Sequence, residues 1–175
     1  DFQSVKSQVV ADLVDRLLEG VPRSLVPILE AAAALRWFNK ELLRAVTQQE
    51  EVSLHYDELR RFPFIRPRVE GLALHDAIRE IIDENLRLSD PDRHPLLHRR
   101  AAAYFAERIA PSSSEADKLT FEQLYHLTRA DETMGLHLFQ NTAEGIAQYS
   151  FYNRMRALMS DVATYVLRNE VYQLW

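Results

Sequence analysis

The sequence predicts a mainly α-helical fold that contains one small β-hairpin. Over most of the 175 residues, the apolar side chains recur at helical spacing and not in the alternation typical of strands. Only four glycines occur in the whole chain, so few points favour sharp turns. One stretch differs from this pattern: "FPFIRPRVEGLAL" at 62–74 runs from aromatic and β-branched residues through a glycine-containing turn into the short segment "LAL". That stretch predicts the hairpin.

The first two helices are expected over 5–18 and 23–37, separated by the glycine and proline of "EGVP" at 19–22. Each should bury one apolar stripe. The stripe of the first comprises Val9, Val10, Leu13, Leu17 and Leu18, and that of the second comprises Leu25, Ile28, Leu29, Ala32 and Leu35.

"NKELLRAV" predicts a short third helix, with Asn39 as its N-cap and the acidic Glu41 in its first turn. A fourth helix is expected over 54–61, ending before Pro63. The hairpin then turns near Gly71, and a fifth helix should run over 76–88. We expect its inward side chains to be Ala77, Ile78, Ile81, Ile82 and Leu86.

Three helices, two short strands and a further helix describe a winged helix. "SDPDRHP" at 89–95 should end it. From Leu96 onward the spacing is helical again, and we expect helical hairpins similar to tetratricopeptide repeats, although no clean repeat period is present. The predicted domains are a connecting helix at 1–20, the winged helix at 21–90 and a helical-hairpin region at 91–175.

Composition limits the function. Acids exceed bases by 26 to 21, and the net charge of −5 is the wrong sign for a domain that binds nucleic acid through its overall field. The chain has no cysteine, and apolar runs such as "AAAAL" at 31–35 are far too short to span a bilayer. We therefore expect a cytoplasmic protein with no membrane segment. Because the chain starts without methionine and ends on the apolar "VYQLW", we also expect it to be part of a longer protein.

Several segments together carry a family resemblance. "GVPRSLVPILEAAAALRWFNKELLRAV", "FPFIRPRVEGLALHDAIREII", "RHPLLHRRAAAYFAERI" and "LYHLTRADETMGLHLF" resemble the region that follows the nucleotide-binding core in bacterial signal-transducing ATPases of the STAND class, relatives of the NB-ARC proteins. The resemblance covers about residues 10–140. Its most specific element is "LHD" at 74–76, which looks like the family's Met-His-Asp motif with leucine in place of methionine.

The resemblance implies a nucleotide-sensing role for Leu74, His75 and Asp76. His75 would contact the phosphate of ADP held by an upstream nucleotide-binding domain, and Asp76 would orient the turn. ADP or ATP with Mg²⁺ would belong to the parent protein, and a protein partner would bind the helical region. From the residues alone, Asp76 is an ordinary N-cap and His75 an ordinary histidine.

No phosphate-binding loop of the form G-x-x-x-x-G-K-[ST] is present in the sequence. We therefore expect no enzyme activity and no cofactor in this chain. The expected function is a regulatory module that couples the nucleotide state of the upstream domain to a helical sensor region.

Two alternatives belong to other classes of protein. One is a DNA-binding transcriptional regulator, in which Arg60, Arg61, Arg66 and Arg68 contact the phosphate backbone. We favour a solvated or interdomain basic face for these arginines. The other alternative is an adaptor that binds protein partners through its helical tail.

Two further motifs have ordinary interpretations. His94 and His98 stand four residues apart, as metal ligands on one helical face would, but Pro95 lies between them and the glutamate of the zinc-protease motif is absent. We expect capping or surface histidines and no metal. The serines of "SSS" at 112–114 have no partnered base and indicate a flexible connector.

Overall fold

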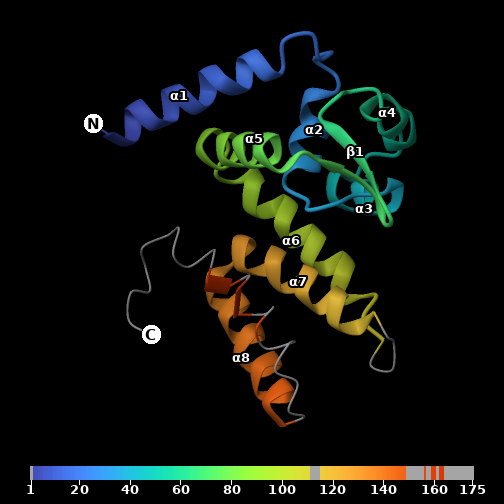
Figure 1. Ribbon diagram of the computed structural model, residues 1–175, viewed down its shortest axis with the longest axis vertical. Helices are drawn as coiled ribbons and strands as arrows, with labels where there is room; N and C mark the ends of the chain where they lie inside the picture. Colours follow the sequence, from blue (N-terminus) through green and yellow to red (C-terminus); the bar gives the residue numbers. More distant parts are fainter. Residues whose placement is uncertain (1, 111–114, 149–155, 157–158, 161, 164–175) are drawn as a thin grey trace. The chain divides into compact units, whose positions relative to one another are not determined.

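The computed structural model describes residues 2–110, 115–148, 156, 159–160 and 162–163, and it confirms the mainly α-helical fold with a small hairpin (Figure 1). Among those residues, no helix combines the length and the apolar character needed to cross a membrane. In chain order the elements are α1 (Phe2–Leu17), α2 (Val26–Ala33), α3 (Lys40–Thr47), α4 (Val52–Leu59), β1 (Ile65–Arg68), β2 (Gly71–Leu74), α5 (Asp76–Ser89), α6 (Arg93–Ala106), α7 (Ala116–Ala130) and α8 (Glu132–Gln148).

The chain forms two compact units, Asp1–Ala101 and Ala102–Trp175. The division falls within α6, later in the chain than the predicted boundary at 90. Residues 89–95 instead belong to the first unit. The backbone N–H of Arg93 donates to Asp90 Oδ1 at 3.0 Å, and its guanidinium donates to Glu30 and to the Pro27 carbonyl.

The core of the first unit forms around α2. All five residues of its predicted stripe are buried, although the helix is shorter than expected at both ends. In α3 the predicted cap is confirmed, because Asn39 Oδ1 accepts from the Leu42 N–H at 2.9 Å. The largest fully buried side chains of this unit are Leu25, Ile28, Leu29, Leu35, Phe38, Leu42, Leu43, Leu59, Leu74, Ile82 and Leu86.

The hairpin pairs β1 with β2 in antiparallel register, with Ile65 opposite Leu74 and Arg68 opposite Gly71. Val69 and Glu70 form the turn, as expected. Phe38 adds a further bridge to the ribbon: its N–H donates to the Leu72 carbonyl at 2.7 Å, and the Leu72 N–H donates back to its carbonyl at 2.8 Å. The hairpin is therefore fastened to the chain between α2 and α3.

The order of these elements is that of a winged helix. A helix (α2) is followed by the bridging residue Phe38, two helices (α3 and α4) and the two strands of the wing. α2 packs against α3, α4, β2 and α5. The winged-helix part of the predicted fold class is therefore present in the first unit.

The predicted apolar face of α1 is partly wrong. Val9 and Leu13 are exposed, whereas Val14, which the predicted stripe left out, is buried. Val10 and Leu17 are half-buried on the same side as Val14. The helix has apolar residues on two sides, and packing against α5 alone covers only one of them.

The predicted face of α5 also needs correction. Ile82 and Leu86 are buried, but Ile78 and Ile81 are only half-buried and Ala77 is exposed. α5 packs against both α1 and α2, which lie beside it in Figure 1. Its first turn, directly after the hairpin, is less covered than its middle.

The second unit contains a helical pair, α7 and α8, joined through Asp131 alone. The helices pack closely at Gly135, where an added Cβ would lie 2.5 Å from Thr128 Cα. The end of α6 also contributes to this unit, because the Phe105 ring stacks on the buried His126 ring with centroids 5.6 Å apart. A helical hairpin was expected here, whereas the serine loop at 112–114 and most residues of 149–175 lie outside the described residues.

Gly71 should be required for the attachment of the hairpin. Its φ of +149° is rarely adopted by residues with a side chain, and an added Cβ would lie 2.4 Å from the Phe38 carbonyl oxygen. We expect Gly71→Ala to lower the free energy of unfolding by at least about 3 kcal/mol. Urea denaturation of the purified chain would measure this loss.

Gly20 provides the matched control. It also has a positive φ, +88°, but nothing lies within 4 Å of an added Cβ. Gly20→Ala should therefore cost only the backbone strain of about 1–2 kcal/mol. Equal losses in the two variants would show that the approach of Phe38 to Gly71 is not important for stability.

Candidate functional site

The junction between β2 and α5 holds the backbone of His75 in place. His75 is the N-cap residue of α5, with φ −59° and ψ 134°. Its N–H donates to the Phe64 carbonyl at 2.8 Å, and its carbonyl accepts from the Arg79 N–H at 2.9 Å. The first hydrogen bond belongs to the end of the hairpin, and the second is the first of the helix. Together they fix the backbone of His75 and therefore the direction of its Cα–Cβ bond.

The His75 side chain, by contrast, is exposed and makes no capping hydrogen bond to α5. Within the described part of the chain it forms no hydrogen bond or ion pair. A neutral imidazole offers one donor and one acceptor. Both remain available to a group outside this chain.

Asp76 is the first residue of α5. The N-cap is His75, so the interpretation of Asp76 as the N-cap is wrong by one position. Its carboxylate accepts from Arg66 of β1 at 2.8 Å, and Arg79 lies 4.0 Å away on the same helix. The hydrogen bond from Arg66, together with the nearby charges of Arg66, Arg79 and Arg68, lowers the pKa of Asp76. Asp76 therefore joins the wing to the start of the helix.

Leu74 lies in the hydrophobic core, with no exposed surface. It pairs with Ile65 across the hairpin, directly before His75 in the chain. Leu74 therefore positions the junction and offers no surface for contact with a nucleotide. Of the three predicted sensing residues, only His75 and Asp76 are accessible.

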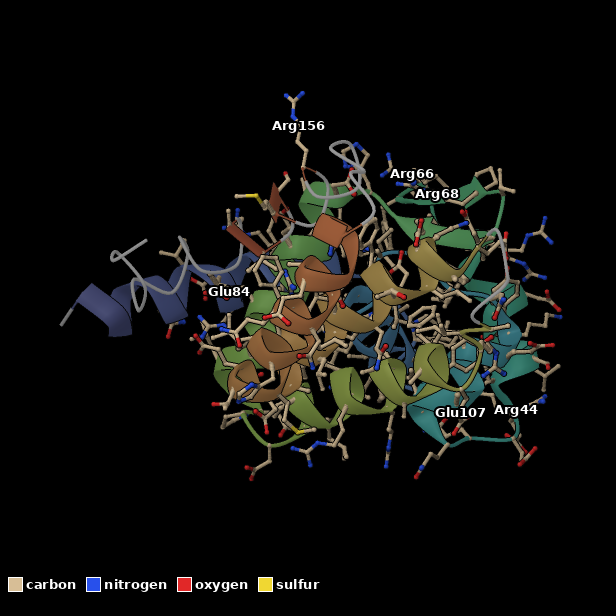
Figure 2. The ribbon with its side chains drawn as sticks, turned by 90° about the horizontal axis from the view of Figure 1, so that it is seen from below. Arg44, Arg66, Arg68, Glu84, Glu107 and Arg156 are labelled. Carbon is tan, nitrogen blue, oxygen red and sulfur yellow. The ribbon has the colours of Figure 1, made fainter. Side chains whose placement is uncertain are left out.

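The four arginines of the predicted basic face have different surroundings. Arg66 and Arg68 project from the hairpin in Figure 2, but Arg66 is engaged by Asp76. Arg60 and Arg61 are exposed directly after the end of α4. These cations therefore do not act together as a single set.

α4 occupies the position of the groove-binding helix in DNA-binding winged helices, and its outward residues are unsuited to DNA. Asp57 and Glu58 are exposed on it, and Leu54 presents an apolar side chain. Lys40 of α3, which could offset this charge, donates to Asp57 at 3.1 Å. An acidic and apolar helix disfavours contact with phosphates.

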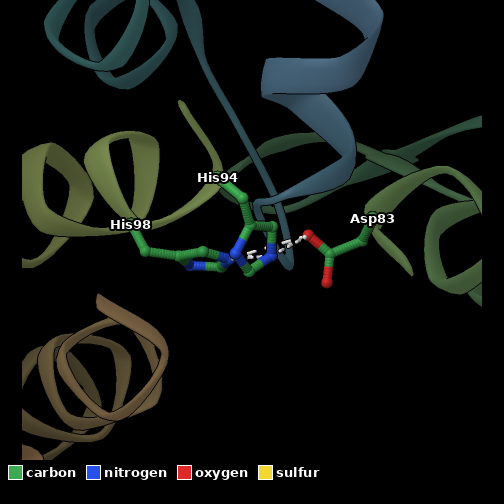
Figure 3. A group of neighbouring side chains, drawn as sticks. All are labelled: Asp83, His94 and His98. Carbon is green, nitrogen blue, oxygen red and sulfur yellow. Dashed lines mark hydrogen bonds and ion pairs between the residues drawn. The ribbon is translucent and has the colours of Figure 1, made fainter. Parts of the chain in front are cut away.

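His94 and His98 are not surface residues, so that expectation is wrong. Both are buried in the first unit, beside Asp83 of α5 (Figure 3). His94 Nε2 lies 3.1 Å from Asp83 Oδ1, and the two Nε2 atoms are 3.2 Å apart. The spacing of the histidines is visible in the sequence, but Asp83 has no sequence signal because the turn between α5 and α6 brings it there.

A comparison of the chain with models of known protein families found no match, and a comparison with curated proteins found none either.

The Asp76–Arg66 pair should contribute a small, pH-dependent stability. Because both side chains are partly exposed, we expect Asp76→Asn to lower the free energy of unfolding at pH 7 by only about 0.2–1 kcal/mol. The pKa of Asp76 is lowered in the folded state, so this contribution is complete above the ordinary value of 3.8 and is lost as the pH falls below it.

Urea denaturation of both proteins, from pH 7 to about pH 2, would check this. The difference between them should shrink at the acidic end. A difference that stays constant with pH would show that the Asp76 carboxylate is not stabilised by its charge.

Proposed function

We propose that this chain is the regulatory module of a STAND-type signal-transducing ATPase. In this proposal, His75 contacts the phosphate of a nucleotide bound by another domain of the same protein. The observation that carries the proposal is the exposed His75 side chain, which has a fixed backbone and no partner within the described residues. This arrangement suits a histidine whose hydrogen-bonding partner is outside the chain.

The surroundings of His75 favour an anion. The first amide groups of a helix have no intrahelical acceptors, and the helix dipole adds partial positive charge at the start of α5. The nearest carboxylate, Asp76, is compensated by Arg66 at 2.8 Å. A phosphate approaching His75 would therefore meet a donor and a positive field.

Such a contact would act as a switch. With ADP bound, the hydrogen bond from His75 would hold the winged helix against the nucleotide-binding domain. Exchange for ATP with Mg²⁺ would remove that contact and release the module. The helical pair α7–α8 would then report the change to a protein partner in the cytoplasm, and this chain would perform no hydrolysis itself.

The test is His75→Ala in the full-length protein that contains the nucleotide-binding domain. A hydrogen bond to a charged group contributes about 1.5–3 kcal/mol. Its loss should weaken ADP binding and accelerate ADP release about tenfold or more, because about 1.4 kcal/mol corresponds to a factor of ten. Release of a fluorescent ADP analogue, followed by stopped flow, would measure the rate.

Two controls make the result specific. His137→Ala, which removes an exposed histidine of α8, should leave ADP release unchanged. His75→Ala in the present chain should scarcely change its stability, because the side chain forms no hydrogen bond or ion pair with the described residues. Unchanged ADP release together with a loss of several kcal/mol in the isolated chain would make His75 a structural histidine and reject the proposal.

DNA binding is the weaker alternative, supported only by the exposed Arg60, Arg61 and Arg68. Given the acidic face of α4, we expect no micromolar binding to random duplex DNA in a gel shift at low salt. Micromolar binding that Arg60→Ala and Arg68→Ala weaken would instead support the transcriptional regulator. The adaptor hypothesis predicts that a partner binds the chain equally well in the presence and absence of the nucleotide-binding domain.

A further inference from the structure

Three side chains from two helices converge in the first unit. Asp83 lies on α5, and His94 and His98 lie one turn apart on the same face of α6 (Figure 3). Asp83 Oδ1 is 3.1 Å from His94 Nε2 and 3.6 Å from His98 Nε2, and the two nitrogens are 3.2 Å apart. The His98 side chain has no exposed surface, and that of Asp83 is 19% exposed.

Hydrogen bonds alone satisfy this triangle poorly. If the Nε2–H of His94 donates to Asp83, the same nitrogen has no lone pair left to accept from His98. His98 Nε2 then lies 3.6 Å from Asp83 Oδ1, which is longer than an ordinary hydrogen bond. If His98 donates to His94 instead, two acceptors face each other at 3.1 Å, His94 Nε2 and Asp83 Oδ1.

A metal ion at the centre would satisfy all three atoms. A triangle with sides of 3.1, 3.2 and 3.6 Å has its corners about 1.9 Å from its centre. Zinc bonds to histidine nitrogen and carboxylate oxygen are about 2.0–2.2 Å long, so the ion would lie slightly out of the plane of the triangle. Ligand atoms of a tetrahedral zinc site are about 3.3 Å apart, close to the three distances observed.

We propose that Asp83, His94 and His98 bind a divalent transition-metal ion, with zinc the best fit. Two imidazoles and one carboxylate suit zinc and its neighbours, whereas magnesium and calcium prefer oxygen ligands alone. The three side chains would leave a fourth position for water. An ion held there would link α5 to α6, so its role would be structural.

His94 and His98 stand one turn apart on α6, and Asp83 approaches them from α5. Pro95 does not disturb the site, because it is the third residue of α6, where a missing N–H removes no intrahelical hydrogen bond. Pro95 was one of the two sequence features that disfavoured a metal at these histidines.

The proposed metal site does not rest on the proposed nucleotide sensing, and its test uses the metal alone. The chain is stripped with a chelator, dialysed and titrated with zinc chloride in a calorimeter. We expect about one ion per chain and a Kd on the order of micromolar or tighter. Cobalt(II) chloride added to the stripped protein should give the intense visible absorption of a four-coordinate ion. The spectrum of the hexaaqua ion, or no saturable zinc binding, would overturn the proposal.

Variants assign the ligands. Asp83→Asn and His98→Gln should each weaken zinc binding at least about a hundredfold, because each removes a direct ligand. His137→Gln, which removes an exposed histidine outside the cluster, should bind zinc as the unaltered chain does. Equal affinities in all three variants would place the ion elsewhere. If a ligand variant fails to fold by circular dichroism, His94→Gln replaces it, and the cobalt spectrum of the unaltered chain still decides.

Discussion

The backbone pairing of Phe38 with Leu72 is the constraint on which the winged helix depends. An isolated two-stranded hairpin is marginally stable in water. Here its second strand exchanges two backbone hydrogen bonds with the segment between α2 and α3, and Gly71 allows the approach. The fixed hairpin in turn places His75. The His75 N–H donates to the carbonyl of Phe64, the residue directly before β1. The exposed histidine therefore keeps its position through a contact made far away in the sequence.

Those parts of the fold that rest on local chemistry could be predicted from the sequence. Asn39 caps α3 because its side chain reaches an amide three residues later, and Gly71 ends the turn because few other residues adopt its φ. The buried face of α1 could not be predicted in the same way. Its apolar residues lie on two sides, and only the packing of α5 selects Val14 over Leu13.

The candidate sites also depend on contacts between segments that are distant in the sequence. His75 was identified through a resemblance, since an exposed histidine at a helix start has no distinctive pattern of its own. The cluster of Asp83, His94 and His98 could not be predicted from the sequence, because Asp83 comes from another helix and Pro95 stands between the two histidines. Proline breaks the interior of a helix but is tolerated in its first turn. Here α6 begins at Arg93 because the Asp90 carboxylate accepts from the Arg93 N–H, and this start places Pro95 in the first turn.

α5 carries both sites, with His75 at its start and Asp83 two turns further on. A helix of this length transmits a displacement of one end to the other, because its backbone hydrogen bonds resist bending. If release of a nucleotide phosphate moves the start of α5, the position of Asp83 relative to the two histidines of α6 changes with it. Coupling between binding sites is reciprocal, so an ion that fixes Asp83 to α6 would alter nucleotide affinity by the same factor as nucleotide alters the affinity for the ion. The two proposed sites are therefore physically connected through one helix, although each has its own ligand.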